Sequence, residues 1–289
     1  MIQSMTGYGK AEALLAGGKL TVEIRTLNSK SADINIKSSL LPKEKDIYIR
    51  KKLAERLQRG TIDVFLNWEA SATEAGKAIN AQMVAEYLQE IKAVIPVQGD
   101  VADATLLGAI LRMPDVAARK EDIVTEENWP LVEDAFEKAL DALSAYRSKE
   151  GAVLYKDVTS RVDKILALYD KVEALEGERI ATVREKMQKV LDELAAKPNP
   201  ERFEQEMIFY LEKYDINEEK VRLRQHCKYF MDTIDGEPYP GKKLGFIIQE
   251  MGREINTTGS KANHAGIQKL VVQMKDELEK AREQSMNIL

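Results

Sequence analysis

Apolar and polar residues alternate along several stretches of the first part of the chain, which is the period of a half-buried β-strand. In the clearest stretch, Leu20, Val22 and Ile24 share one face. Three segments follow this pattern, 20–27, 33–37 and 61–68, and residues 2–9 are predicted to form an opening strand with glycines near its end. A helical pattern that begins at Pro42 and runs to about Gln58 separates the last two segments. We therefore predict an α+β fold that opens with a four-stranded sheet and one helix, over residues 1–72.

After the last strand the apolar residues recur every three or four positions, which predicts helices. Residues 131–196 contain no proline. A continuous helix of ~40 residues would span roughly 60 Å, which is typical of an arm that packs on itself or on another subunit. Gly151 and Gly177 are the expected bends. We therefore predict a helical region with a long arm over residues 73–197 and a C-terminal helical domain over residues 198–289.

The composition is that of a globular protein with an acidic balance. The chain has 289 residues, 31% of them charged, and a formal net charge of −5. Any surface for nucleic acid must therefore be a local patch on an acidic remainder. The single cysteine, Cys227, excludes an intramolecular disulfide and fits a reducing cytoplasm. Neither a signal peptide nor a stretch of ~20 apolar residues occurs, so we expect a cytoplasmic protein that makes no membrane contact.

Several common catalytic motifs are missing from the sequence. It contains no Gly-x-x-x-x-Gly-Lys-Ser/Thr phosphate loop and no Gly-x-Gly-x-x-Gly after a strand. It also lacks a Gly-x-Ser-x-Gly elbow. Chemistry based on ATP, on nicotinamide or on a covalent acyl intermediate is therefore not predicted.

The predicted helix at 42–58 carries the densest group of basic residues, among them Arg50 and Lys51. Such a surface can follow a phosphate backbone, because neutralised phosphates release counterions. The alternative is a solvated face, since Glu44, Asp46 and Glu55 dilute the positive charge. The sequence leaves both interpretations open.

The segment 241–261 carries most of the candidate chemistry. An apolar stripe predicts a helix from about Lys243 to Asn256, followed by a flexible, hydroxyl-rich turn that ends in Lys261. Glu250 and Glu254 lie one helical turn apart on the same flank, and Arg253 lies within a turn of each. Two carboxylates beside a guanidinium can hold a divalent cation and a phosphodiester. The alternative is a solvated amphipathic helix in which the arginine softens carboxylate repulsion.

A second candidate group lies on the preceding predicted helix, where Glu219, Arg222, His226 and Phe230 share one face. His226 could act as a general acid or base, because the pKa of histidine lies near neutrality. It could equally be a partly buried side chain that pairs with the glutamate or stacks on the phenylalanine. The short loop after this helix permits an antiparallel pair, in which His226 would face Glu250.

Three sequence motifs together indicate a family. The run Gln249–Thr257, continued by Gly-Ser-Lys at 259–261, closely resembles the C-terminal signature of the bacterial YicC/YloC family of endoribonucleases. The opening residues 4–9, Ser-Met-Thr-Gly-Tyr-Gly, resemble the N-terminal signature of that family, and Arg147–Gly151 resembles a further piece. The resemblance implies cleavage of RNA phosphodiester bonds, dependence on a divalent cation such as Mg²⁺ or Mn²⁺, and a preference for structured or hairpin RNA.

Given this activity, the chemistry of individual residues predicts their roles. Glu250 and Glu254 would bind the metal, with the missing ligands supplied by water or a second subunit, and His226 would shuttle a proton. These three residues and Arg253 form the expected catalytic set. The residues expected to bind RNA are Arg50, Lys51, Arg222, Lys242, Lys243, Asn256 and Lys261.

Members of the family look like ring-shaped hexamers built from two trimers that enclose RNA. Two features of this sequence independently favour a homo-oligomer: the long arm, and an apolar stripe on the final helix from Ala265 to about Asn287. The alternative function is a non-catalytic RNA-binding or scaffold protein. A purely structural coiled-coil protein would leave the 241–261 motif unexplained.

Overall fold

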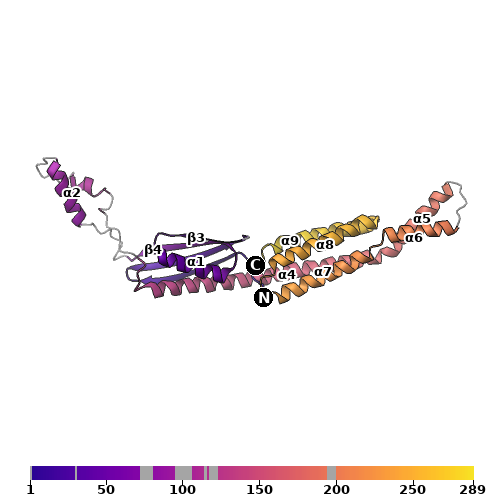
Figure 1. The fold of residues 1–289 in the computed structure, drawn as a ribbon, viewed down its shortest axis with the longest axis horizontal. Helices are drawn as coiled ribbons and strands as arrows, with labels where there is room; N and C mark the ends of the chain where they lie inside the picture. The colour runs from indigo at the N-terminus through magenta and orange to yellow at the C-terminus, as the bar shows by residue number, and fades with distance from the viewer. Residues whose placement is uncertain are drawn as a thin grey trace.

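The computed structural model describes residues 2–29, 31–71, 81–94, 106–113, 116, 123–193 and 200–289. The predicted α+β class is confirmed: a sheet near one end is followed by helices over the rest of the described chain (Figure 1). Both predicted domain boundaries, near residues 72 and 197, lie outside the described residues.

The sheet has four strands, which are β1 (Gly7–Leu15), β2 (Gly18–Leu27), β3 (Ala32–Lys37) and β4 (Gly60–Ala70). Their order across the sheet is β1-β2-β4-β3, and only the β3–β4 pair is parallel. Parallel neighbours need a crossover connection, and α1 (Lys43–Leu57) supplies it. Leu20, Val22 and Ile24 are completely buried, which confirms the predicted alternation.

The first strand begins later than the sequence pattern predicted, at Gly7 instead of Ile2. The residues before it bond elsewhere, because the backbone N–H of Ser4 donates to the carbonyl of Arg147 and that of Met5 to the carbonyl of Asn287. The first residues therefore hold the middle of the long helix and the end of the chain together.

One helix, α4 (Trp129–Ala174), contains 46 residues and runs through both halves of the molecule (Figure 1). Its first part lies on β1, where a Cβ atom on Gly9 would come 2.0 Å from the carbonyl oxygen of Ala139. Its second part packs on helices of the C-terminal region. Two separate apolar cores therefore share this helix. A further helix of the N-terminal half is α2 (Ala81–Val94).

The predicted bend at Gly151 is wrong, because α4 continues through this residue as a helix. A Cβ atom at Gly151 would come 2.2 Å from the carbonyl oxygen of Ile2, so the glycine permits close approach of the N-terminal segment. The helix is interrupted at Leu175, two residues before the other predicted bend. Beyond this point α5 (Glu176–Glu193) and α6 (Pro200–Lys213) lie side by side at the far end (Figure 1).

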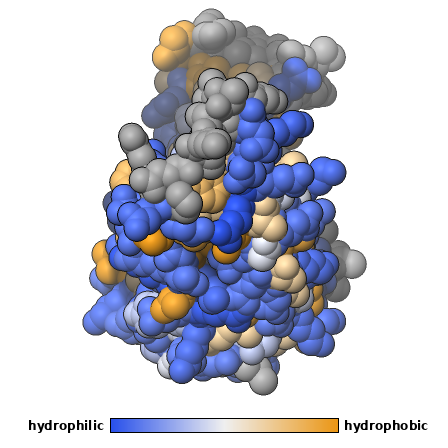
Figure 2. All heavy atoms as spheres, turned by 90° about the vertical axis from the view of Figure 1, so that its right-hand side faces the viewer, coloured by the Kyte–Doolittle hydropathy of each residue, from blue (hydrophilic) through white to orange (hydrophobic). Residues whose placement is uncertain are grey.

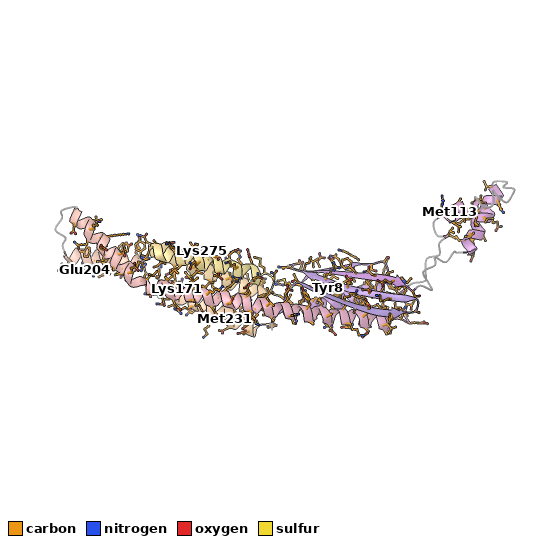
Figure 3. The ribbon with its side chains drawn as sticks, turned by 180° about the vertical axis from the view of Figure 1, so that it is seen from behind. Tyr8, Met113, Lys171, Glu204, Met231 and Lys275 are labelled. Atoms are coloured by element: carbon orange, nitrogen blue, oxygen red, sulfur yellow. The ribbon has the colours of Figure 1, made fainter. Side chains whose placement is uncertain are left out.

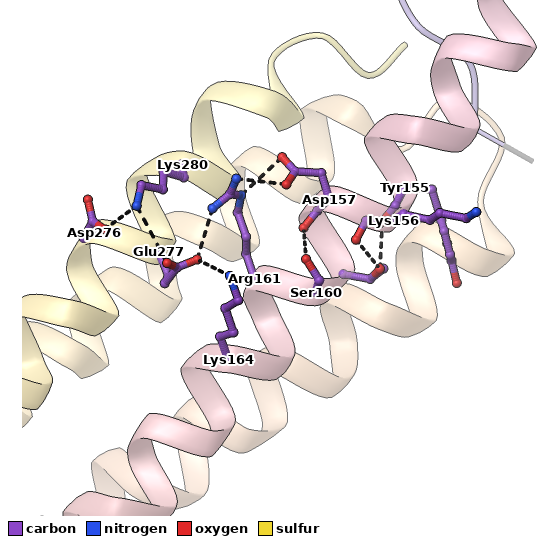
Figure 4. A network of polar contacts seen from close by, with 10 residues as sticks. Tyr155, Lys156, Asp157, Ser160, Arg161, Lys164, Asp276, Glu277 and Lys280 are labelled. Carbon is purple, nitrogen blue, oxygen red and sulfur yellow. Dashed lines mark hydrogen bonds and ion pairs between the residues drawn. The ribbon is translucent and has the colours of Figure 1, made fainter.

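The C-terminal half is a bundle of α4 with α7 (Asn217–Gly236), α8 (Gly241–Ala262) and α9 (Ala265–Ser285). A polar network joins α4 to α9 (Figure 4), in which the Arg161 guanidinium contacts the Glu277 carboxylate at 3.1 Å. The apolar stripe of α9 is buried inside this bundle, so it is not the open face that the sequence suggested.

The two cores meet at Arg147, whose side chain is buried without a carboxylate partner among the described residues. Its guanidinium donates to the carbonyl of Met5 at 3.0 Å and to the hydroxyl of Thr26 at 3.3 Å. Burial lowers the pKa of Arg147 to about 10. Thr6 donates to the Glu150 carboxylate at 2.8 Å. The residues of the N-terminal motif therefore have an architectural role at this junction.

The surface is largely hydrophilic where Figure 2 shows it, which is the end formed by α5 and α6, with separate hydrophobic side chains between the charged ones. Within the described part of the chain, no helix combines the length and apolar character that a bilayer crossing requires.

Candidate functional site

Helix α8 carries the C-terminal motif, and its buried face is the one that the sequence predicted. The buried apolar residues of the stripe are Leu244, Ile247, Ile248, Met251 and Ile255. The predicted turn after Asn256 is wrong, because the helix continues to Ala262. The Thr257 and Thr258 hydroxyls donate to backbone carbonyls one turn earlier, at 3.0 and 2.9 Å. The motif is therefore a rigid helical surface that ends at Asn263, in the left-handed conformation.

The seam between α7 and α8 is fixed by an ion pair near each end. Lys261 contacts the Glu219 carboxylate at 2.8 Å, and Lys243 contacts the carboxylate of Glu237. In an antiparallel pair, residues at the same level have numbers with a constant sum. This sum is 480 for both ion pairs, so they belong to one register. Counting seven residues along each helix from the Lys261–Glu219 pair, towards the other pair, places His226 level with Glu254. The sequence predicted an antiparallel pair, which is confirmed, but with His226 opposite Glu250.

Both acidic residues of the motif lie on the flank of α8 that faces α7. Lys243 and Lys261 mark this flank, and Glu250 and Glu254 stand seven residues inside them, at the same helical phase. Glu254 is buried, with 8% of its surface exposed, whereas Glu250 is partly exposed. The Arg253 guanidinium contacts the Glu250 carboxylate at 2.8 Å, and no ion pair joins it to Glu254 within the described chain. The predicted catalytic residues therefore gather around one seam.

A buried polar group closes one end of this seam. Glu219 is only 4% exposed, and its Oε2 atom has no hydrogen-bond partner in the described structure. Beside it, the Tyr169 hydroxyl lies 3.1 Å from the hydroxyl of Thr258, and burial raises the pKa of Tyr169 to about 12. Sequence reasoning placed Glu219 on the face of His226 but did not include it among the site residues. The buried carboxylate holds the Lys261 ammonium at the end of the seam.

The opposite flank of α8 forms one wall of a groove of about 670 Å³ against α9. Its polar lining residues are Gln249, Arg253, Asn256, Lys275, Glu279 and Arg282. Arg253 lies between the two flanks, because it lines the groove and also pairs with Glu250, one turn earlier in the helix. Sequence reasoning missed Lys275 and Arg282, although their spacing of seven residues places them on one face of α9.

The other predicted RNA-binding residues of this region differ in whether their side chains already have a partner within the chain. Asn256 is exposed on the groove, and Lys242 is exposed without a partner in the described structure. Lys243 pairs with Glu237 and lies 4.7 Å from the centre of the Tyr229 ring. Arg222 pairs with Glu218 at 2.5 Å on the outer side of α7. The cations near the motif are therefore spread over both flanks of α8.

The basic residues of α1 have a different environment, because three of them, Lys45, Lys52 and Arg56, face acidic residues that follow α1 in sequence. These ion pairs are Lys45–Glu126 at 3.0 Å, Lys52–Glu133 at 2.8 Å, Lys52–Glu137, Arg56–Glu137 at 2.7 Å and Arg56–Asp141 at 2.9 Å. Hydrogen bonds from Lys52 and Tyr48 lower the pKa of Glu133. The basic stripe of α1 therefore docks this helix on α4, which neither interpretation of the sequence anticipated.

Arg50 and Lys51 are the two residues of α1 that the sequence singled out for RNA. Arg50 bonds to Asp46 at 2.6 Å and to the backbone carbonyl of Ile34 at 2.5 Å. Lys51 is exposed and has no partner in the described structure. Of this pair, only Lys51 has its charge free for an external ligand.

The structure permits a limited test of the expected metal. Within the described residues, no group of three or more His, Cys, Asp or Glu side chains converges on one point. Glu250 and Glu254 supply at most two carboxylate ligands from one chain. Mg²⁺ is commonly bound by one or two carboxylates together with water and substrate phosphates. The donor set therefore fits a cation that is shared with RNA and does not fit a closed protein site.

Comparison with known proteins agrees with the motifs at both ends of the chain. Residues 172–289 match the family described as endoribonuclease YicC-like, C-terminal, and residues 2–156 match endoribonuclease YicC-like, N-terminal region. The chain belongs to the endoribonuclease YicC-like family. This YicC-like chain is 32% identical over 296 residues to the probable endoribonuclease YicC of Clostridioides difficile (strain 630), with all of both chains covered.

A second relative supports the same assignment. The YicC-like chain is 30% identical over 293 residues to the probable endoribonuclease YicC of Haemophilus influenzae, again over the full length of both chains. The family resemblance inferred from the sequence is thus confirmed, as is the expected class of enzyme, an endoribonuclease. The motif that carries the resemblance is the one that α8 presents to α7 on one flank and to α9 on the other.

Proposed function

We propose that this YicC-like chain cleaves phosphodiester bonds in structured or hairpin RNA, at the seam between α7 and α8. The observation that carries the proposal is the register of these helices. It places residue His226 level with residue Glu254 along the two helices, and Lys261 stands at one end of the same seam. An acid–base group, carboxylates and a cation are the groups that phosphodiester cleavage needs close together.

Each side chain has a role in this proposal that its surroundings support. His226 is partly exposed, so it can exchange a proton with an oxygen of the reacting phosphate. Glu219 anchors the Lys261 ammonium through one hydrogen bond, which leaves its other N–H groups for phosphate oxygens. The Arg253 guanidinium can bind a further oxygen by a charge-assisted hydrogen bond.

The proposal includes a divalent cation, Mg²⁺ or Mn²⁺, held by Glu250 and Glu254 together with RNA phosphate and water. Such a cation would lower the pKa of a bound water and neutralise charge that develops on the phosphate. In the RNA-free chain, Arg253 offsets the charge of Glu250. Entry of a cation would therefore free the arginine for the RNA.

The test is cleavage of a hairpin RNA by wild-type, Glu250→Gln and Glu254→Gln proteins, with Mg²⁺, with Mn²⁺ and with a chelator. We expect each substitution, and the chelator, to reduce the cleavage rate by about 100-fold or more, because each removes a charge needed in the transition state. Glu283→Gln is the matched control, since Glu283 is exposed on α9 away from the groove lining. Undiminished cutting by both site variants would contradict the proposal.

The second candidate function is an RNA-binding or scaffold protein without catalysis, favoured by the cations that line the α8–α9 groove. Gel-shift and cleavage assays on the same samples separate the two functions. RNA that is retained but stays intact with every metal would support the scaffold. Mass spectrometry of the RNA ends then identifies cleavage products and excludes a trace contaminant, if Glu250→Gln protein yields none.

We also propose that the chain assembles as a hexamer in the cytoplasm. Burial of the α9 stripe within the chain removes one of the two reasons that the sequence offered. The other reason is supported at α5 and α6, where Val190, Ile208 and Phe209 are each more than half exposed. A second copy could cover these side chains. Light scattering in moderate salt tests this, and a mass near the 32.6 kDa of one chain would contradict it.

A further inference from the structure

The groove between α8 and α9 has a strongly biased charge. Three cationic side chains, Arg253, Lys275 and Arg282, line it together with one carboxylate, Glu279. The Arg282–Glu279 contact is long, at 3.6 Å, and Lys275 has no ion pair or hydrogen bond within the described chain. The groove is therefore a local cationic surface that favours an anionic ligand, although the formal net charge of the protein is −5.

The shape of the groove depends on two glycines of α8. Gly245 and Gly252 both line it, and a Cβ atom at Gly245 would meet no other atom within 4 Å. Larger side chains at these positions would project into the groove. The glycine positions and Asn256 lie on one face over eleven residues, so the groove runs for about 16 Å along the helix.

The floor of the groove is apolar, and Ile248 and Leu278 contribute to it. Amides at its rim, from Gln249 and Asn256, can donate and accept hydrogen bonds with base edges. Cations for phosphates, amides for bases and an apolar floor for rings are the combination that single-stranded nucleic acid needs. Packed helices lie only about 8–10 Å apart, so the groove between them suits one strand better than a duplex, which contains two backbones.

We propose that the α8–α9 groove binds the single-stranded RNA segment next to the cleaved phosphodiester, with Lys275 and Arg282 on its phosphates. The proposal rests on the RNA-cleaving function proposed above and assigns its substrate a single-stranded flank. Arg253 connects the two sites, because it lines the groove and pairs with Glu250 on the other flank of α8. A strand that leaves the groove past Arg253 would reach the α7–α8 seam.

The first test compares a hairpin RNA that carries a single-stranded tail with the same hairpin without a tail. We expect the double variant Lys275→Ala, Arg282→Ala to raise KM for the tailed RNA by about 10-fold or more while kcat stays within about twofold. The slope of log affinity against log salt should fall by about 1.4, because each lost phosphate contact on a single strand contributes about 0.7. The matched control, Lys228→Ala with Lys269→Ala, removes the same charge from exposed positions outside the groove.

The second test fills the groove without removing a charge. Gly245→Met should leave the melting temperature equal or higher, because methionine is a better helix former than glycine. It should nevertheless raise KM for the tailed RNA by about 10-fold. A stable variant with weakened binding cannot be explained by misfolding.

Binding of a short labelled single strand, measured by fluorescence anisotropy in chelator, separates this inference from the proposed activity. If the wild-type protein binds the strand through the groove but never cuts RNA, the proposed cleavage is contradicted and the proposed binding in the groove is supported. If the wild-type protein cuts RNA and both groove variants do so with the same KM as the control variant, the proposed role of the groove is contradicted. Absence of binding by wild-type protein would overturn it as well.

Discussion

Helix α1 and the α8–α9 groove both carry a row of basic residues, yet the two rows have opposite environments. On α1, Lys52 and Arg56 each contact two carboxylates of α4. In the groove, Lys275 has no partner in the described structure, and the contact of Arg282 with Glu279 is 3.6 Å long. The first row joins two elements of one core, whereas the second faces solvent.

The difference shows that the carboxylates packed around a basic residue decide whether its charge is available to a ligand. A run of lysines and arginines in sequence is equally compatible with both environments, and α1 has the denser run. The acidic partners of α1 lie about eighty residues away, on α4. A free cation on a groove wall is available to phosphate, while a cation between two carboxylates is already neutralised.

Charge reversal on α1 should give the largest effect on stability. Lys52→Glu would place a third carboxylate beside Glu133 and Glu137, so we expect the free energy of unfolding to fall by about 2 kcal/mol. Both tryptophans of the chain, Trp68 and Trp129, pack against the N-terminal core, so urea unfolding followed by fluorescence reports this region.

Two measurements control that experiment. Lys51→Glu reverses the charge of the neighbouring exposed residue, and it should change the unfolding free energy by less than about 0.5 kcal/mol. Cys227 is buried in the other core, where burial raises the pKa of its thiol to about 12. Its slow alkylation should be unaffected by Lys52→Glu. Faster labelling would mean that loss of the α1–α4 contacts also opens the C-terminal core.

Acid should weaken the same interface more gradually. The pKa of Glu133 is lowered from its ordinary value of 4.5 in the folded chain, with Lys52 as the main cause. The resulting stability is complete above pH 4.5 and is lost as the pH falls through the folded pKa. We expect a loss of about 1 kcal/mol, measured by urea unfolding between pH 6 and pH 3.5. Lys52→Met should flatten this dependence, and an equally steep curve in that variant would refute the assignment.

Truncation in the groove should have the smallest effect on stability. Lys275→Ala removes a side chain that makes no ion pair in the described structure, so the unfolding free energy should change by less than about 0.5 kcal/mol. Thermal unfolding by circular dichroism suffices to measure this. A loss comparable to that of Lys52→Glu would abolish the contrast between the two rows.

Local patterns were sufficient to predict most of the fold. Alternation located the buried face of β2 at Leu20, Val22 and Ile24, and helical periodicity located the buried face of α8. The end of α8 was predicted wrongly because Thr257 and Thr258 bond back to their own helix. A sequence does not reveal whether hydroxyls do so or break the helix.

The candidate site was only partly predictable for a different reason. Glu250, Glu254 and Arg253 are close in sequence, so helical spacing alone relates them. The level position of His226 depends on the register between two helices, which the Lys261–Glu219 pair reveals. The groove needs α8 and α9 packed together before Lys275 and Arg282 acquire a common neighbour. Long-range packing of this kind leaves no local pattern.

The shared helix α4 sets the relative orientation of the two cores by residue count. Each residue of an α-helix adds about 100° of rotation and 1.5 Å of length. One residue inserted near Gly151 would turn the bundle by that angle relative to the sheet and separate Arg147 from one set of its contacts. Seven inserted residues would restore the phase to within about 20° but lengthen the helix by about 10 Å. A change in the length of α4 near Gly151 should therefore disturb the junction of the two cores even when no residue is substituted.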